Sequence, residues 1–381
     1  MSTTVPSDWR LAPNALLFLL LLILVTVGVI AFAAWQWRRR RVTGRIMLVV
    51  LSQVLVMLSV LTYINRADDL ITTWSSLVGS TAGQSPAVVS RSAGTGVFGT
   101  RAPNSWKLTP AQRQVDMSTA AHSTVTSITI GGGATGYNLN AQVYLPGSYN
   151  DSQSAARKFP VLELLAGFPG SYLSWSTGIQ LKQTLDELIA QGKMPAVIAV
   201  MPSQNPHPPD NSECLNGSRA AHPDSRAETY LTGDVPAYLA QHYRTGQGRT
   251  NWVIGGYSTG GYCATNLALR HPDRYASVIA LSGYFTAIHN GNTTPLFQDR
   301  QRRAANSPQL TVTQPHPKLA FFTINAKDNL LDAVSNQNFI NAIPAADAHL
   351  AMTTQSGGHT PLVWRVGSRY AFIWLAQLFS K

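Results

Sequence analysis

The chain has 381 residues, of which only 12% are charged, and its 29 Lys and Arg against 18 Asp and Glu give a formal net charge of +11. Outside one short arginine stretch the basic residues are scattered, which argues against a nucleic-acid-binding protein. Two cysteines are too few for a disulfide-rich scaffold or a cysteine-based zinc site. No nucleotide motif stands out either, so we expect neither a metal nor a cofactor.

Two apolar runs, residues 15–35 and 46–64, predict a membrane anchor over residues 1–66. Each run is long enough to cross the hydrocarbon core as a helix. The intervening loop, 38–45, holds five arginines, and short basic loops stay in the cytoplasm. We therefore expect a multi-pass protein of the cell membrane with the rest of the chain outside the cytoplasm. A cleaved signal peptide, the alternative for the first run, carries its positive charge before the apolar stretch, where this chain has only Arg10.

The next segment, residues 67–117, is rich in Ser, Thr, Gly and Pro around 79–105 and is interpreted as a flexible linker. Residues 118–381 show a different pattern, in which short apolar runs alternate with segments of helical spacing. The expected strands are 123–130, 137–145, 159–166, 196–201, 251–255, 275–281, 318–324 and 349–353, and the expected helices are 179–190, 227–243, 260–269 and 361–379. This alternation predicts an α/β domain with a mostly parallel central sheet.

The strongest local motif is Gly256-Tyr257-Ser258-Thr259-Gly260, between an apolar strand and a helix. A nucleophile elbow requires this strand–turn–helix context. The turn is tight enough that glycines on both sides of the serine relieve crowding. Ser258 is therefore the predicted nucleophile, and a Gly-rich turn with an ordinary serine is the alternative.

A serine hydroxyl needs a base to take its proton, and in an elbow of this kind an acid and then a histidine follow along the chain. His359 follows a predicted strand and precedes a helix that begins with proline, which places it at the carboxyl edge of the sheet. Asp328, in the loop after strand 318–324, is the expected acid. Asp332, at the start of the next helix, is the alternative and could instead complement the helix dipole.

The oxyanion of a tetrahedral intermediate needs two donors. We expect the backbone N–H groups of Thr259, directly after the nucleophile, and of Phe168, in the loop after strand 159–166. The long polar segment 203–226 is expected to overhang the site. Cys214, in that segment, could form a disulfide with Cys263 on the helix after the elbow, and two free thiols are the alternative.

With these residues placed, the chain from about 120 to 380 resembles the putative-esterase family, which includes esterase D-like enzymes and envelope mycolyltransferases. The matching stretches are 143–146, 164–170, 227–232, 256–261 and 357–359. The resemblance implies an α/β-hydrolase fold, a Ser258–Asp328–His359 triad and oxyanion donors at Phe168 and Thr259. The two-helix anchor resembles membrane-bound members of that group.

Three functions compete at this stage. The first is an extracytoplasmic serine esterase that cleaves acyl esters through an acyl-enzyme. The second is an acyltransferase, similar to mycolyltransferases, that moves the acyl chain to a sugar or glycerol hydroxyl. The third and weakest is a non-catalytic envelope-binding module. The expected partners are an acyl ester or lipid substrate and the bilayer.

Overall fold

The computed structural model describes residues 12–68, 74, 85–94, 105–208, 211–218, 221–288, 297 and 299–379. Its helices are α1 (Leu16–Gln36), α2 (Val42–Asp68), α4 (Pro110–Thr119), α5 (Ser174–Thr177), α6 (Leu181–Ala190), α7 (Ala227–Thr229), α8 (Val235–His242), α9 (Thr259–Arg270), α10 (Arg300–Ala305), α11 (Pro308–Thr311), α12 (Leu330–Ala342) and α13 (Pro361–Phe379). Its strands are β1 (Ala87–Ser92), β2 (Thr124–Gly131), β3 (Asn138–Leu145), β4 (Val161–Leu165), β5 (Ile198–Pro202), β6 (Asn216–Ser218), β7 (Ala221–Arg226), β8 (Trp252–Tyr257), β9 (Ser277–Leu281), β10 (Ala320–Ala326) and β11 (Ala348–Thr354).

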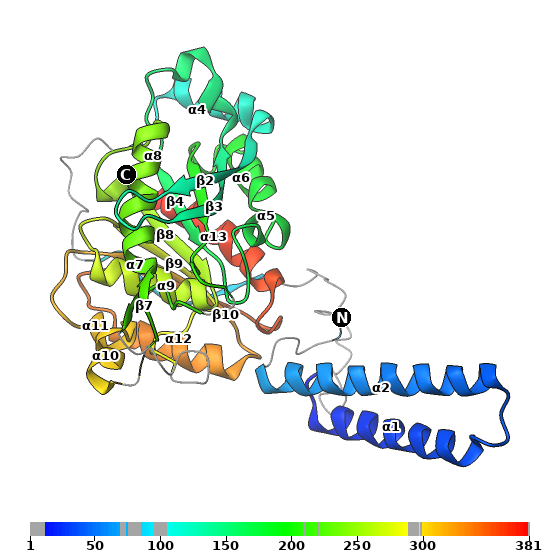
Figure 1. Cartoon of the computed structure of the whole chain (residues 1–381). Coiled ribbons are helices and arrows are strands. Elements are labelled where there is room, and N and C mark those ends of the chain that lie inside the picture. Colours follow the sequence, from blue (N-terminus) through cyan, green and yellow to red (C-terminus); the bar gives the residue numbers. More distant parts are fainter. Residues whose placement is uncertain are drawn as a thin grey trace, which may run out of the picture.

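The two N-terminal helices form a hairpin that projects from the rest of the molecule (Figure 1). Both are long and apolar enough to cross a membrane, with mean hydropathies of 3.1 and 2.3. Between the two helices, Thr26 Oγ1 lies 3.3 Å from Ser59 Oγ. The basic loop is shorter than predicted, because α2 already begins at Val42 and includes Arg45.

The predicted linker contains regular structure that the sequence analysis missed. Strand β1 pairs antiparallel with β11, and α4 begins with a capping box in which Thr109 and Gln112 satisfy each other's backbone N–H groups. Between them, Trp106 is buried and its indole N–H donates to the Thr250 carbonyl at 3.0 Å. Part of the segment thus packs onto the domain, while 69–73, 75–84 and 95–104 lie outside the described residues.

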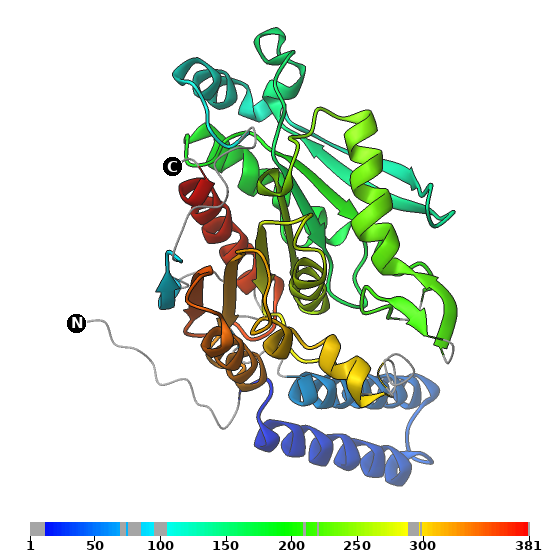
Figure 2. The same ribbon diagram turned by 90° about the vertical axis from the view of Figure 1, so that its left-hand side faces the viewer.

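Nine strands form one sheet in the order β1-β11-β10-β9-β8-β4-β5-β3-β2. The six strands from β11 to β5 run parallel to their neighbours, and the antiparallel pairs lie at the two ends. Figure 2 shows α6 and α13 on one side of the sheet and α8 and α9 on the other. This mostly parallel, two-sided arrangement confirms the predicted α/β-hydrolase class.

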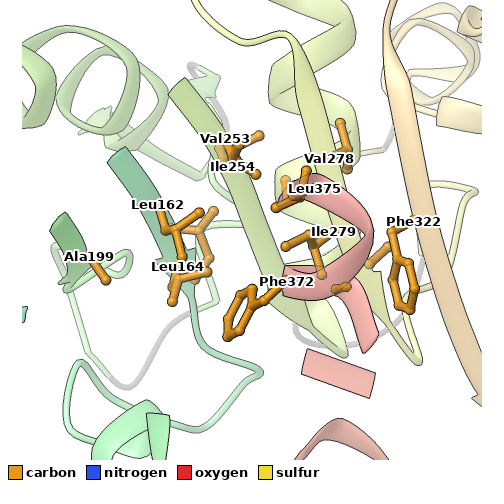
Figure 3. Packing of buried hydrophobic residues seen from close by; sticks show 14 of the residues in the cluster. Leu162, Leu164, Ala199, Val253, Ile254, Val278, Ile279, Phe322, Phe372 and Leu375 are labelled. Carbon is orange, nitrogen blue, oxygen red and sulfur yellow. The ribbon is translucent and has the colours of Figure 1, made fainter. Parts of the chain in front are cut away.

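The core lies between the sheet and these helices. Phe372 and Leu375 of α13 pack toward Ile279 of β9 (Figure 3), and all three side chains are buried. Full burial of side chains of this size contributes about 1.5–3 kcal/mol each. The continuous apolar runs of the central strands follow from this burial on both faces.

One carboxyl group lies inside this core, on the central strand β4. Glu163 is fully buried and accepts a hydrogen bond of 2.9 Å from the Tyr275 hydroxyl, while its other oxygen has no hydrogen-bond partner in the described part of the chain. Burial raises the pKa of Glu163 from 4.5 to about 8, although Tyr275 and Arg274 act in the opposite direction. The Glu163 carboxyl group therefore keeps its proton to a higher pH in the folded protein than in the unfolded chain.

This proton makes stability fall as pH rises. Between pH 4.5 and about 8 the unfolded chain loses the Glu163 proton and the folded chain keeps it, so the free energy of unfolding declines by up to about 1.4 kcal/mol per pH unit. We expect Glu163→Gln to flatten this decline, measured by denaturant unfolding of the full chain in detergent at pH 6 and pH 8. An unchanged difference between the two pH values would refute the assignment.

Candidate active site

The predicted elbow forms where β8 meets α9. Ser258 has φ 55° and ψ −127°, a strained conformation for a residue with a side chain, and its N–H donates to the Leu281 carbonyl at 2.9 Å. The flanking glycines are required sterically, since a Cβ on Gly256 would lie 2.3 Å from the Gly260 backbone and one on Gly260 would lie 2.4 Å from the Leu165 carbonyl oxygen. The turn thereby places Ser258, which is partly exposed, at the carboxyl edge of the sheet.

The predicted histidine lies at the same edge, after β11. His359 Nδ1 is 2.7 Å from Asp332 Oδ2, and both side chains are mostly buried, at 16% and 13% exposure. The carboxylate partner of His359 is therefore Asp332, in the first turn of α12. The expectation that Asp328 would be this partner is wrong.

Asp328 instead holds the loop that carries the histidine. Its two carboxylate oxygens accept the backbone N–H groups of Gly357 and Gly358 at 3.1 and 3.0 Å. Both glycines have positive φ, at 129° and 58°, so the loop adopts a bend that glycine permits. The chain travels from β10 through Asp328 into α12, and the following helical turn brings Asp332 to the imidazole.

An aromatic contact chain joins the histidine to the elbow. Trp364, on α13, meets His359 edge-on with ring centroids 5.2 Å apart, and it stacks on Tyr257 at 4.3 Å. Because Tyr257 directly precedes Ser258, Trp364 contacts both the imidazole and the nucleophile turn. Within the described residues the Ser258 hydroxyl makes no hydrogen bond to His359, as is common for such pairs without bound substrate.

The other candidate histidines are engaged elsewhere. His271 Nε2 lies 2.9 Å from Glu228 Oε1, His316 Nε2 contacts the Val312 carbonyl at 3.0 Å, and His349 Nε2 contacts Ser90 Oγ at 2.8 Å. His289 lies outside the described residues. Across the described ranges, no three His, Cys, Asp or Glu side chains are grouped to hold a metal ion.

The predicted oxyanion loop lies against the elbow. A Cβ on Gly167 would be 2.9 Å from the Ser258 Cβ and 2.8 Å from the Tyr257 ring, so only glycine allows this approach. In the described part of the chain, neither the Phe168 N–H nor the Thr259 N–H donates a hydrogen bond. Trp175, which could have lined the site, is buried and donates to the Leu165 carbonyl at 3.0 Å.

The long segment 203–226 is joined to the helix that follows the elbow. Cys214 and Cys263 form a disulfide with an S–S distance of 2.08 Å. Next to it, Glu213 is buried and accepts the Tyr284 hydroxyl at 2.7 Å, and that hydroxyl lies 3.5 Å from Thr259 Oγ1. Burial raises the pKa of Glu213 to about 7. The sequence analysis missed Glu213, and no motif in this polar segment marks it.

A cavity of about 340 Å³ opens between the oxyanion loop and the start of this segment. Its lining includes Phe168, Tyr172 and Gln204. The Gln204 amide nitrogen donates to the Ala166 carbonyl at 2.7 Å, whereas its buried oxygen has no partner among the described residues. The cavity therefore borders the oxyanion loop, and the Gln204 oxygen is buried below its surface.

Comparisons with known proteins identify the family of the chain. The model of the family described as "Putative esterase" matches residues 132–365. An uncharacterized protein of Corynebacterium glutamicum is 30% identical over 254 residues, 62% of this chain and 57% of its own length. An endo-1,4-beta-xylanase/feruloyl esterase of Xylanibacter ruminicola is 26% identical over 46% of this chain and 22% of its own length, so the chain spans little more than half of these relatives at most.

Solved structures share the fold. A ferulic acid esterase superposes with a TM-score of 0.59 at 23% identity, covering 68% of this chain and 99% of its own. An S-formylglutathione hydrolase from Agrobacterium tumefaciens gives a TM-score of 0.57 at 16% identity, covering 68% and 96%. At these identities the likeness shows the fold alone.

Proposed function

Because the chain belongs to the putative-esterase family and is an ester-cleaving enzyme of the α/β-hydrolase fold, we propose that Ser258 is its nucleophile, His359 its general base and Asp332 the acid that orients the base. The observation that carries this proposal is the strained backbone of Ser258 at the end of β8. Strain of this kind costs about 1–3 kcal/mol and persists where function requires it.

In the proposed acylation step, Ser258 Oγ attacks the acyl carbonyl carbon while His359 Nε2 takes the hydroxyl proton. The tetrahedral intermediate then collapses, the ester C–O bond breaks, and His359 returns the proton to the leaving alcohol. A water molecule repeats the sequence on the acyl-enzyme and releases the acid. Asp332 on Nδ1 fixes the tautomer in which Nε2 faces the serine and stabilises the imidazolium.

The oxyanion is stabilised, in this proposal, by the backbone N–H groups of Phe168 and Thr259. Thr259 is the first residue of α9, where the helix dipole favours negative charge. The Tyr284 hydroxyl, which donates to Glu213, also contacts the Thr259 side chain. Donors held in place before the reaction lower the barrier because no reorganisation is needed during it.

We place the enzyme in the cell membrane with its catalytic domain outside the cytoplasm. Helices α1 and α2 are both long enough to span the bilayer. The arginines of the connecting loop orient the hairpin with that loop in the cytoplasm. The Cys214–Cys263 disulfide suits an oxidising compartment.

Acyl transfer is the second candidate function, and the cavity beside Phe168 favours it. A sugar or glycerol hydroxyl bound in this cavity, which Phe168, Tyr172 and Gln204 line, would lie beside the proposed oxyanion loop. Such a hydroxyl would replace water in the second step, with the same serine and histidine.

The test is an assay of the purified full chain with a short acyl ester, with and without trehalose. An esterase releases the free acid at a rate that trehalose does not change. Acylated trehalose with negligible free acid would overturn hydrolysis in favour of transfer. Failure to form either product would refute both functions.

A further inference from the structure

An exposed apolar cluster lies at the start of α12. The side chains of Leu330, Leu331 and Val334 are 69%, 69% and 59% exposed. In the described part of the chain from residue 105 onward, the other exposed large apolar side chains are Leu173, Leu310 and Tyr370, which are less exposed, at 38%, 51% and 37%, and lie on separate segments. We call Leu330, Leu331 and Val334 the α12 patch. A concentrated patch of this kind marks a contact surface rather than ordinary surface variation.

The patch lies on the same part of α12 as a residue of the proposed triad. Asp332, between Leu331 and Val334, turns inward to His359 and is 13% exposed. Asn329 caps the helix by accepting the Asp332 N–H at 3.0 Å, which fixes this first turn. Leu330 and Val334 lie two positions from Asp332 and therefore on the opposite, outward face of the helix.

The helix that carries the patch lies near the apolar hairpin. Figure 1 shows α12 beside the end of α2, and the view turned by 90° again shows the two helices next to each other (Figure 2). Helix α10 lies on the same side of the domain and carries Arg300, Arg302 and Arg303, of which Arg300 is exposed. An exposed arginine on the same side of the domain as exposed apolar side chains suits a surface of lipid headgroups.

We propose that the α12 patch rests on the outer leaflet of the bilayer that holds α1 and α2, so that the active site draws long-chain esters directly from the lipid phase. This inference rests on the proposed membrane anchor and esterase activity. A long acyl chain gains free energy from staying in an apolar environment. A site that is separated from the leaflet only by the first turns of α12 shortens the passage of that chain through water.

Two esters of one alcohol test this, with the full chain reconstituted in vesicles of equal phosphatidylethanolamine and phosphatidylglycerol. The triple variant Leu330→Gln, Leu331→Gln, Val334→Thr should cleave 4-methylumbelliferyl palmitate, dispersed in the bilayer, about tenfold more slowly, because it loses apolar contact area. Cleavage of dissolved 4-methylumbelliferyl acetate should stay within about twofold, because the reacting groups are intact. The control Val88→Thr, an exposed apolar residue on β1, should change neither rate.

Equal loss of both rates, or no loss of either, would overturn the inference. Absence of acetate cleavage by the unmodified chain would instead refute the proposed function.

A second measurement does not need activity. Because both native cysteines are bonded, Leu331→Cys introduces a single thiol for an environment-sensitive fluorophore. Lipids with a spin label near the headgroup should quench this fluorophore in vesicles, and a fluorophore at Val88→Cys should be unaffected. No quenching at position 331 would mean that the patch binds something other than the bilayer.

Discussion

Ser258→Ala is expected to lower kcat for a short acyl ester by about 10⁴-fold or more, since the covalent step loses its nucleophile while oxyanion donors and binding remain. The variant should also lose labelling by a fluorophosphonate probe. Folding should be retained, because Ser258 is partly exposed and the substitution by alanine removes none of the surrounding contacts that stabilise the turn. The rate is measured on the full chain in detergent, and circular dichroism checks the fold.

Ser282→Ala is the matched control. Ser282 follows the neighbouring strand β9, is buried and also has a positive φ, at 47°. Ser282 therefore has a strained backbone like Ser258 but does not lie in a nucleophile motif. We expect this variant to keep its activity and its labelling, so a similar loss in both variants would point to a structural effect and not to a nucleophile.

Asp332→Asn should lower kcat by about 10³- to 10⁴-fold, because an amide on Nδ1 favours the wrong imidazole tautomer and cannot stabilise the imidazolium. Its KM should change little, since Asp332 faces the histidine and not the substrate. Steady-state kinetics with a soluble ester separates the two parameters.

Asp328→Asn is the companion variant, and it distinguishes the two carboxylates. It should lower kcat by less than about 10²-fold, because it only loosens the loop under His359. Its main effect should be on stability, by about 1–3 kcal/mol for the weakened charge-assisted bonds. A larger kcat loss for Asp328→Asn than for Asp332→Asn would restore Asp328 as the acid and contradict the assignment made here.

Periodicity was sufficient to predict the parallel strands, the β2–β3 hairpin and the C-terminal helix, because burial on both faces leaves uninterrupted apolar runs. The location of Ser258 and His359 at one edge of the sheet was predictable for a related reason. Each follows a strand of the parallel region, and the carboxyl ends of parallel strands share one edge of a sheet. Local glycine patterns then fixed which residue of each loop mattered.

The choice between Asp328 and Asp332 could not be made from sequence. Both residues closely follow β10, and the position of Asp328 in the loop makes it the more expected acid. Which aspartate reaches His359 depends on which carboxylate accepts the backbone N–H groups of Gly357 and Gly358. The bend that presents these groups forms only in the folded structure. Strand β1 was missed for the same kind of reason, since its six residues are stabilised by pairing with β11, more than 250 positions away in the chain.

Glu213 and Gln204 show a further limit. Each lies in a polar segment whose composition predicts a surface loop, yet both are buried because the segment folds back over the sheet edge and the disulfide joins it to α9. Their importance follows from which partners they meet, or lack, in three dimensions.

The central claim is that one hydroxyl becomes acylated. The most direct measurement incubates the full chain with a fluorophosphonate probe, reduces and digests it with trypsin, and locates the adduct by tandem mass spectrometry. The account predicts the adduct on Ser258 within the peptide Thr250–Arg270, at one equivalent per chain. An adduct on a different residue, with Ser258 unmodified in active enzyme, would contradict it.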